Sequence, residues 1–163
     1  MISSKNKEAL SIAYAAVIAA IYVVLTLIFA PISYGPIQVR VSEALCVLPI
    51  FTPAAIPGIF IGCLLANAVG GAIIWDVIFG SLASLAAAYI SYLFRRKRVL
   101  AYLSPIVINA LVVPFVLKYA YGIEDMIWYM MFTVAAGEII SVGILGSILS
   151  IVLEKYRGIL FRE

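Results

Sequence analysis

The chain of 163 residues is too apolar to be a soluble domain. Hydrophobic residues make up 66% of it, charged residues make up only 12%, and the mean hydropathy is +1.18. A soluble fold needs more polar surface than this composition supplies, so the chain is expected to be an integral membrane protein. Its formal net charge of +3 is too small to indicate a nucleic-acid-binding protein. The apolar runs are long and continuous, which predicts a single all-α transmembrane domain over residues 1–163.

The first predicted helix covers Ala9–Ala30 and ends at Pro31. We expect it to be retained, because it lacks a small-residue cleavage site followed by a polar domain. The second segment, Val41–Phe51, has only 11 residues. At about 1.5 Å per residue it covers roughly half of a ~30 Å hydrocarbon core. It must therefore begin earlier or be shielded by neighbouring helices.

The third and fourth predicted helices are rich in small residues. Thr52 as N-cap and Pro53 at the first helical position predict the start of the third, which ends near Val69 before two glycines. The fourth covers Ile73–Phe94. Small residues at helical spacing let a neighbouring backbone approach closely. On these two helices they are Gly58, Gly62, Ala66, Gly80, Ala83, Ser84 and Ala87.

The distribution of cations predicts the orientation of the bundle. The fifth and sixth predicted helices are Leu100–Leu117 and Met126–Leu153, which gives six spans. With the amino terminus in the cytoplasm, nine of the 11 cations fall inside: Lys5, Lys7, Arg95, Arg96, Lys97, Arg98, Lys155, Arg157 and Arg162. Only Arg40 and Lys118 remain outside, as the positive-inside rule expects.

The residue types argue against an enzyme or a metal protein. Cys46 and Cys63 lie in apolar segments without CxxC spacing, and the chain has no histidine. We expect packed thiols, no metal and no cofactor. The chain also lacks a paired-acid metal motif, a nucleophile elbow and a Walker motif.

Several polar side chains inside the apolar sequence predict an outward-facing pocket. A charged side chain at membrane depth costs about 2.5 to 3.5 kcal/mol, so it indicates a polar cavity or pathway. Six candidates fall at the outer helix ends: Gln38, Arg40, Glu43, Asn67, Trp75 and Asp76. Asn109 and Glu138 lie deeper, and Tyr34, Trp75 and Trp128 are expected as aromatic walls.

Each candidate also has a structural interpretation. Arg40 and Glu43 are three apart and could neutralise one another. Asp76 and Trp75 could be a helix start and part of an aromatic belt, and Asn67 could cap its helix. Glu138 has no cation within one helical turn, so it must find a partner on another helix, stay protonated or bind a ligand. We favour a ligand-facing role for Glu138.

Three stretches carry a resemblance to a known family: Gly35–Leu45 (GPIQVRVSEAL), Phe51–Gly58 (FTPAAIPG) and Gly62–Asn67 (GCLLAN). The chain resembles the QueT family of queuosine-precursor transporters, which belongs to the substrate-binding S components of energy-coupling factor (ECF) transporters. The resemblance implies a compact bundle of six transmembrane helices, with both termini cytoplasmic, in the cell membrane of a bacterium.

The resemblance also implies partners. An S component works with a transmembrane T component and two ATPase subunits, which supply ATP hydrolysis. The alanine face of the first helix would meet the T component, and the segment Pro31–Val39 would gate the site. That face consists of Ala9, Ala13, Ala16 and Ala20, whose spacing alone allows packing within the chain or against another subunit.

The ligand implied by the resemblance is a 7-deazaguanine such as queuine, preQ1 or preQ0. One carboxylate, Glu138 or Glu43, could accept its N–H and amine together. An aminomethyl precursor would need a second acid, either Asp76 or the remaining glutamate. Three amides could address its carbonyl and ring nitrogens: Asn109, Asn67 and Gln38. The alternatives are an S component for another vitamin or nucleobase, and a stand-alone channel or facilitator.

Overall fold

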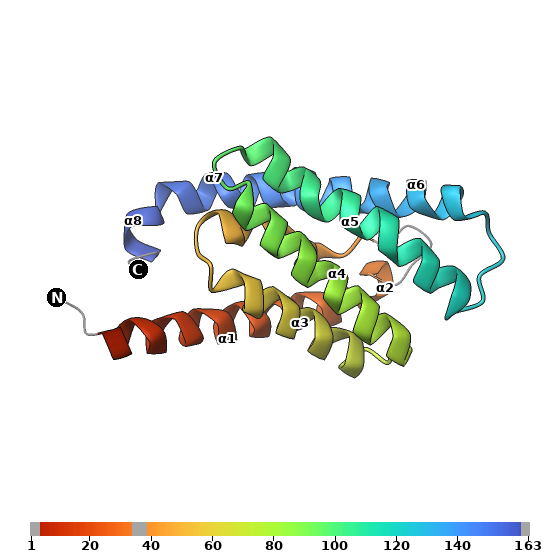
Figure 1. Ribbon diagram of the computed structural model, residues 1–163, viewed down its shortest axis with the longest axis horizontal. Helices are drawn as coiled ribbons and strands as arrows, with labels where there is room; N and C mark the ends of the chain where they lie inside the picture. Colours follow the sequence, from red (N-terminus) through yellow and green to blue (C-terminus); the bar gives the residue numbers. More distant parts are fainter. Residues whose placement is uncertain (1–3, 34–38, 161–163) are drawn as a thin grey trace.

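The chain forms an elongated helical bundle, shown in Figure 1 as a computed structural model that describes residues 4–33 and 39–160. No strand occurs in these two ranges. The elements are α1 Ser4–Ile28, α2 Ala30–Ser33, η1 Val41–Ile50, α3 Ala55–Val69, α4 Ile74–Leu93, α5 Arg98–Tyr119, α6 Ile127–Glu138, η2 Ile139–Gly146, α7 Ser147–Lys155 and α8 Arg157–Leu160.

Within residues 4–33 and 39–160, four stretches are long and apolar enough to cross a membrane: Lys5–Ile28, Ile74–Leu93, Arg98–Tyr119 and Ile127–Lys155. The prediction of an all-helical membrane protein is confirmed, and four of the six expected spans have the required length. The other two expected spans, η1 and α3, are apolar but shorter, with 10 and 15 residues. They extend about 20 Å as a 3-10 helix and about 22 Å as an α-helix.

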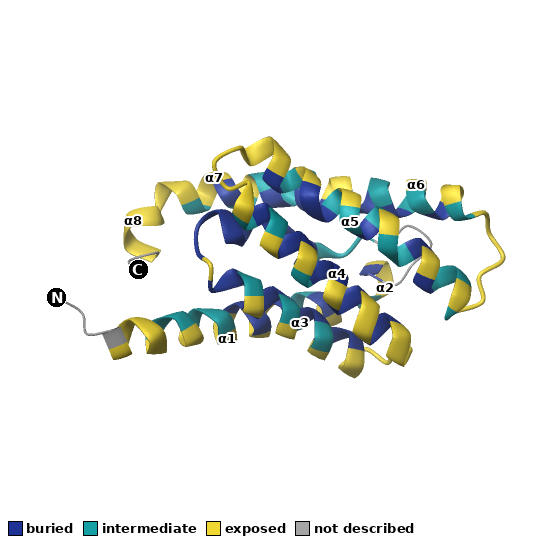
Figure 2. Ribbon diagram, viewed as in Figure 1, coloured by how far each residue is buried: buried dark blue, intermediate teal, exposed yellow. Residues whose placement is uncertain are grey.

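The outer surface of the bundle is more apolar than that of a soluble protein. Large apolar side chains such as Ile28, Val99 and Ile151 are 65–70% exposed on outward faces, which Figure 2 colours yellow. The buried side chains include many polar ones: Thr26, Ser33, Ser42, Glu43, Thr52, Asn67, Asp76, Ser81, Ser84, Ser91, Ser104, Asn109, Glu138, Ser141 and Ser150. Apolar surface facing outward and polar groups facing inward fit a bundle surrounded by lipid.

The short segment η1 lies in the centre of the bundle. It is a 3-10 helix, and nine of its ten residues, Ser42 to Ile50, are buried. It packs against α1, α3, α4, α5, η2 and α7. The expectation that neighbouring helices shield this segment is therefore confirmed.

Small residues bring α1 and α3 into close contact, as their spacing predicted. A Cβ atom on Gly62 would lie 2.7 Å from Cβ of Tyr22, and one on Gly58 would lie 2.8 Å from the carbonyl oxygen of Ala15. Neither position could accept a side chain without moving the helices apart. Helix α3 begins at Ala55, slightly later than the predicted start at Pro53. The Thr52 hydroxyl, the predicted N-cap, accepts a 3.2 Å hydrogen bond from the Ala54 amide.

Hydroxyl groups join α4 to α5 across their interface. Ser104 donates a 2.9 Å hydrogen bond to the carbonyl of Ala87, and Ser91 donates a 2.7 Å bond to the carbonyl of Ala101. Such bonds replace the hydrophobic driving force that is missing between helices in lipid.

The last long span changes its helical type in the middle. After α6 the chain continues without a break through the π-helical η2 into α7. The change begins at Ile139, directly after Glu138. The π-segment packs against η1, where a Cβ atom on Gly146 would lie 2.7 Å from Cγ1 of Val47.

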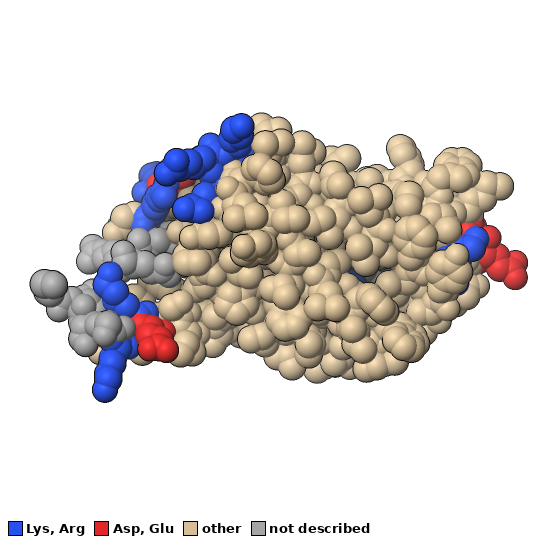
Figure 3. Space-filling model, viewed as in Figure 1, with Lys and Arg blue, Asp and Glu red and all other residues tan. Residues whose placement is uncertain are grey.

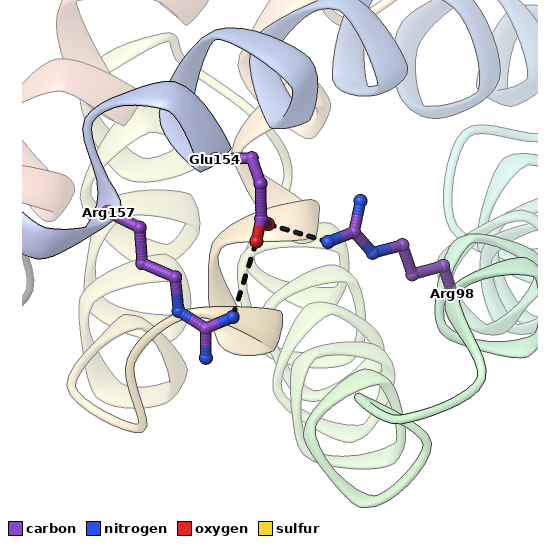
Figure 4. A network of polar contacts seen from close by, with 3 residues as sticks. All are labelled: Arg98, Glu154 and Arg157. Atoms are coloured by element: carbon purple, nitrogen blue, oxygen red, sulfur yellow. Dashed lines mark hydrogen bonds and ion pairs between the residues drawn. The ribbon is translucent and has the colours of Figure 1, made fainter.

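On the face shown in Figure 3, the exposed charged side chains gather at the two ends of the bundle, and the surface between them is almost entirely uncharged. The start of α1, the α4–α5 connection and α8 share one end, where most cations lie (Figures 1 and 3). Glu154 accepts a hydrogen bond from Arg98 at 2.6 Å and one from Arg157 at 3.5 Å (Figure 4). This network ties α5, α7 and α8 together at the cationic end.

Candidate functional site

A small buried cavity of about 20 Å³ collects most of the predicted polar residues. Within the described part of the chain, its polar and charged lining is Arg40, Glu43, Asp76, Ser84, Asn109 and Glu138, and it is completed by Gly80, Val113 and Val134. These residues come from η1 and its preceding residue, α4, α5 and α6. Side chains that are distant in the sequence thus share one interior site.

Helical spacing explains how three helices present these residues to the same cavity. Residues four apart lie on one face of an α-helix. The lining from α4 is Asp76, Gly80 and Ser84; from α5 it is Asn109 and Val113; from α6 it is Val134 and Glu138. Each helix therefore turns one narrow stripe toward the cavity.

Glu138 lies on α6 and finds its partner on another helix, as one of the sequence interpretations allowed. The amide nitrogen of Asn109 donates a 2.8 Å hydrogen bond to its Oε1. Its Oε2 is buried and has no hydrogen-bond partner among the described residues. The residue is only 6% exposed, so this oxygen is an acceptor inside the cavity wall rather than in solvent.

Glu43 is held by two neutral donors. The Tyr22 hydroxyl of α1 donates to Oε1, and the Cys46 thiol donates to Oε2 at 2.9 Å. A second polar contact lies nearby, between the hydroxyls of Thr26 and Ser42 at 2.6 Å. These contacts fix η1 against α1 and orient the Glu43 carboxylate.

Arg40 and Glu43 line the same cavity. The Arg40 guanidinium lies with Nη1 3.9 Å from Sγ of Cys63 on α3. The interpretation that Arg40 and Glu43 pair with each other stays a prediction.

Cys63 is buried among hydrogen-bond donors. Besides Arg40, its sulfur faces Ser84 Oγ at 3.4 Å and Asn67 Nδ2 at 3.6 Å. The Asn67 side chain therefore turns into the bundle rather than capping its own helix. Its Oδ1 is buried and lacks a hydrogen-bond partner among the described residues. The prediction that both thiols are packed is confirmed, since Cys46 and Cys63 are fully buried.

Asp76 connects the cavity to the loop between α5 and α6. It lies in the first turn of α4, and its Oδ2 accepts a 3.0 Å hydrogen bond from the Tyr121 hydroxyl. The same hydroxyl accepts a 3.3 Å bond from the amide of Ile73. Asp76 is thus both a helix-start residue and part of the cavity wall.

The structure does not bring the predicted aromatic walls to the cavity. Trp75 is 54% exposed and stacks on Phe79, and both rings line a separate apolar groove of about 450 Å³ between α4 and α5. Neighbouring residues on a helix are turned by about 100°, so Trp75 faces away when Asp76 faces inward. Trp128 is 67% exposed and also faces outward. The remaining candidates, Tyr34 and Gln38, lie outside the described residues.

The alanine face of α1 points away from the bundle. Its four members are all exposed: Ala9, Ala13, Ala16 and Ala20. The second alanine pair, Ala15 and Ala19, faces α3 instead. The described bundle therefore leaves a face of small residues uncovered along one side of α1.

Sequence analysis did not identify four residues as part of the site: Tyr22, Cys63, Ser84 and Tyr121. For two of them, the spacing of polar residues in the sequence could have indicated a role. Tyr22 and Thr26 are four apart on an otherwise apolar helix, and Ser84 continues the spacing of Asp76 and Gly80. Tyr121 carried no such signal, because its position in a loop does not predict which helix it contacts.

The charges and the volume define what this site can do. Among the described residues it offers three carboxylates, one guanidinium, one amide and one hydroxyl group, which suits a polar, nitrogen-rich ligand. A volume of about 20 Å³ can hold a water molecule, whereas small-molecule pockets usually enclose roughly 300 to 1,000 Å³. Binding of such a ligand requires the surrounding elements to move apart.

Comparisons with known proteins agree on one family. Residues 12–155 match the sequence model of a family described as QueT transporter. Over 84 residues the chain is 40% identical to a curated protein of Lactococcus lactis subsp. cremoris (strain MG1363), described as queuosine precursor transporter QueT. That alignment covers 50% of this chain and 48% of the relative, so it spans about half of each protein. No solved structure matches the chain.

Proposed function

Because the family match extends over residues 12–155, this chain belongs to the QueT transporter family, and we propose that it binds a queuosine precursor for import. The relative from Lactococcus lactis is described as a transporter of such a precursor. The observation that carries the proposal is the convergence of Arg40, Glu43, Asp76, Asn109 and Glu138 on one buried cavity. Polar groups at membrane depth are expensive and are generally functional.

The chemistry of a 7-deazaguanine suits the pair Asn109 and Glu138. The base presents a ring N–H and an exocyclic amine side by side, next to a carbonyl. A carboxylate can accept both donors, while an amide nitrogen can donate to the carbonyl. Oε2 of Glu138 has no competing partner among the described residues, so a ligand can engage it without breaking a protein hydrogen bond.

We assign this protein the role of an S component, which captures the ligand outside and hands it to partner subunits. The exposed alanines of α1 would meet a T component, because small residues let another helix approach closely. The cationic end of the bundle would face the cytoplasm under the positive-inside rule. The polar cavity would then open toward the outside, in the membrane of a bacterial cell.

Binding by the purified protein tests the ligand. Isothermal titration in detergent micelles would compare queuine and its deazaguanine precursors with riboflavin, thiamine and biotin. The proposal expects saturable binding of a deazaguanine alone. Binding of a vitamin with no response to any deazaguanine would show instead an S component for a different nutrient.

Reconstitution tests the transport role against a stand-alone facilitator. Liposomes containing the chain alone should not accumulate ligand, whereas liposomes that also contain a T component and two ATPase subunits should do so only with ATP. An Ala16→Leu variant should bind ligand normally but lose copurification with the T component. The matched control is Ala15→Gly, which alters the face of α1 that contacts α3. ATP-independent uptake by the chain alone would favour the facilitator.

A further inference from the structure

The last span carries three buried polar atoms that have no hydrogen-bond partner within the described residues: Oε2 of Glu138, Oγ of Ser141 and Oγ of Ser150. Both serines are fully buried, and Glu138 is 6% exposed. A buried hydroxyl that has lost its water without gaining a partner destabilises the packing around it. Contact with water or with a ligand would remove this cost.

Ser141 lies where the last span packs against η1. It follows Glu138 by three residues, about one helical turn, and precedes Gly146 by five, the spacing of hydrogen bonds in a π-helix. Position 146 lies directly beside η1, since an added Cβ would be 2.7 Å from Cγ1 of Val47 and 3.4 Å from the carbonyl oxygen of Ala44. The side of the span that carries Ser141 therefore faces this contact, which we call the η1–η2 seam.

Side-chain hydrogen bonds hold the elements on either side of the seam. On one side, η1 is tied to α1, because the Tyr22 hydroxyl donates to Glu43. On the other side, α6 is tied to α5 by the bond from Asn109 to Glu138. Ser141 lies between these two groups of elements, and its hydroxyl has no partner among the described residues. Separation at Ser141 therefore costs less than separation at either of these two bonds.

The helical type of the last span changes at the same place. The π-helical η2 begins at Ile139, directly after Glu138. A π-helical segment interrupts the regular hydrogen bonds of an α-helix and is a common origin of kinks. Beyond it, α7 is tied to the start of α5 by the contact between Glu154 and Arg98. A change within η2 can therefore redirect α6 while α7 stays in place.

We infer that the cavity opens along the η1–η2 seam when α6 swings away from η1 about η2, and that Ser141 then joins the binding site. The closed cavity of about 20 Å³ is too small for a nucleobase, so one of its walls must move. Val134 and Glu138, the α6 part of its lining, move with this helix. Opening brings the Ser141 hydroxyl and Oε2 of Glu138 into contact with water or ligand. The part that concerns the ligand rests on the proposed function, whereas the movement of α6 does not.

Two matched substitutions test the inference. Ser141→Ala and Ser150→Ala each remove a fully buried hydroxyl without a partner, so both should raise the Tm of the ligand-free protein in detergent. Isothermal titration of the full-length protein would then measure the affinities for queuine, preQ1 and preQ0. Ser141→Ala should weaken binding by about tenfold, because alanine favours the closed seam and offers the ligand no hydroxyl. Ser150 lies on α7, beyond η2, so Ser150→Ala should bind within about twofold of the wild type.

Hydrogen–deuterium exchange of the same protein tests the movement without a ligand. Backbone amides of η2 should exchange at least about tenfold faster than those in the middle of α4, because local opening at the hinge exposes them. Equal exchange in the two segments would overturn the hinge at η2.

The binding results separate the inference from the proposed function. Wild-type affinity in Ser141→Ala, or an equal loss in Ser150→Ala, would overturn the role of Ser141 while leaving ligand binding intact. A lower Tm in Ser141→Ala would show that its hydroxyl is paired and would also overturn the inference. Failure of the wild type to bind any of the three deazaguanines would overturn the proposed function, and fast exchange in η2 would still support the movement of α6.

Discussion

The side-chain amide of Asn109 on α5 donates a 2.8 Å hydrogen bond to Oε1 of Glu138 on α6. This contact fixes the plane of the carboxylate and leaves Oε2 as a buried acceptor with no partner among the described residues. A group held in this way is pre-organised, so a ligand loses little free energy in orienting it. Under the proposed function, this pair would read the edge of the ligand.

Glu138→Gln should weaken deazaguanine binding by about 10- to 100-fold, because the amide supplies a donor where the ligand also presents donors. The substitution keeps an oxygen that can accept from Asn109, so the fold should be preserved. Titration calorimetry checks the affinity. Ser104→Ala is the control, since it removes a buried hydroxyl bond between α4 and α5 away from the cavity. Wild-type affinity in Glu138→Gln would remove this residue from the binding site.

Tyr22→Phe should destabilise the bundle by about 1 to 3 kcal/mol, because it removes a donor from the buried Glu43 carboxylate. Glu43→Gln should act through the same contact, so the double variant should be less destabilised than the sum of the single ones. Unfolding in detergent, followed by circular dichroism, provides the free energies for this cycle. Additive effects would contradict the contact. Tyr22→Phe combined with Ser91→Ala, which shares no hydrogen-bond partner with it, should be additive.

Gly62→Ala should destabilise the protein by about 1 to 3 kcal/mol through overpacking between α1 and α3. The added methyl would lie 2.7 Å from Cβ of Tyr22 and 3.1 Å from Cα of Ala19. Gly158→Ala is the control, because nothing lies within 4 Å of an added Cβ there. Thermal unfolding of both variants in the same detergent separates them. Equal stability of the two would contradict the close approach.

Glu154→Gln should change stability by less than about 1 kcal/mol, although its carboxylate contacts both Arg98 and Arg157. The side chains of this network are 39–55% exposed, so water and salt screen their charges. Thermal unfolding at low and at high ionic strength should show the wild type losing its small advantage as salt rises. A loss above about 2 kcal/mol, or one independent of salt, would contradict this assignment.

The convergence of the polar residues was predictable, because a buried charge in an apolar chain must find other polar groups. The spacing of Asp76, Gly80 and Ser84 also placed them on one helix face. The prediction that Trp75 forms a wall of the cavity is wrong. Residue spacing shows which residues share a helix face but not which face points into the bundle. Asp76 lies on the face that lines the cavity, so the neighbouring Trp75 lies on the face that lines the apolar groove.

Other features depend on contacts between distant segments, and local sequence does not encode them. The 3-10 form of η1 and the π-form of η2 occur where the two segments pack together, at Val47 and Gly146. Cys63 lies in an apolar segment, so the sequence predicts only a packed thiol. Its sulfur has polar contacts because Ser84 on α4 and Arg40 before η1 lie next to it in the folded bundle.

The central position of η1 has a consequence for how the protein is made. Nine of its ten residues are buried by other parts of the chain, so it has no face suited to lipid, and it carries the Glu43 carboxylate. Such a segment has no stable place in a bilayer by itself. We therefore expect the longer helices to enter the membrane first and to enclose η1 during assembly. The polar cavity would then form only when the bundle closes around η1.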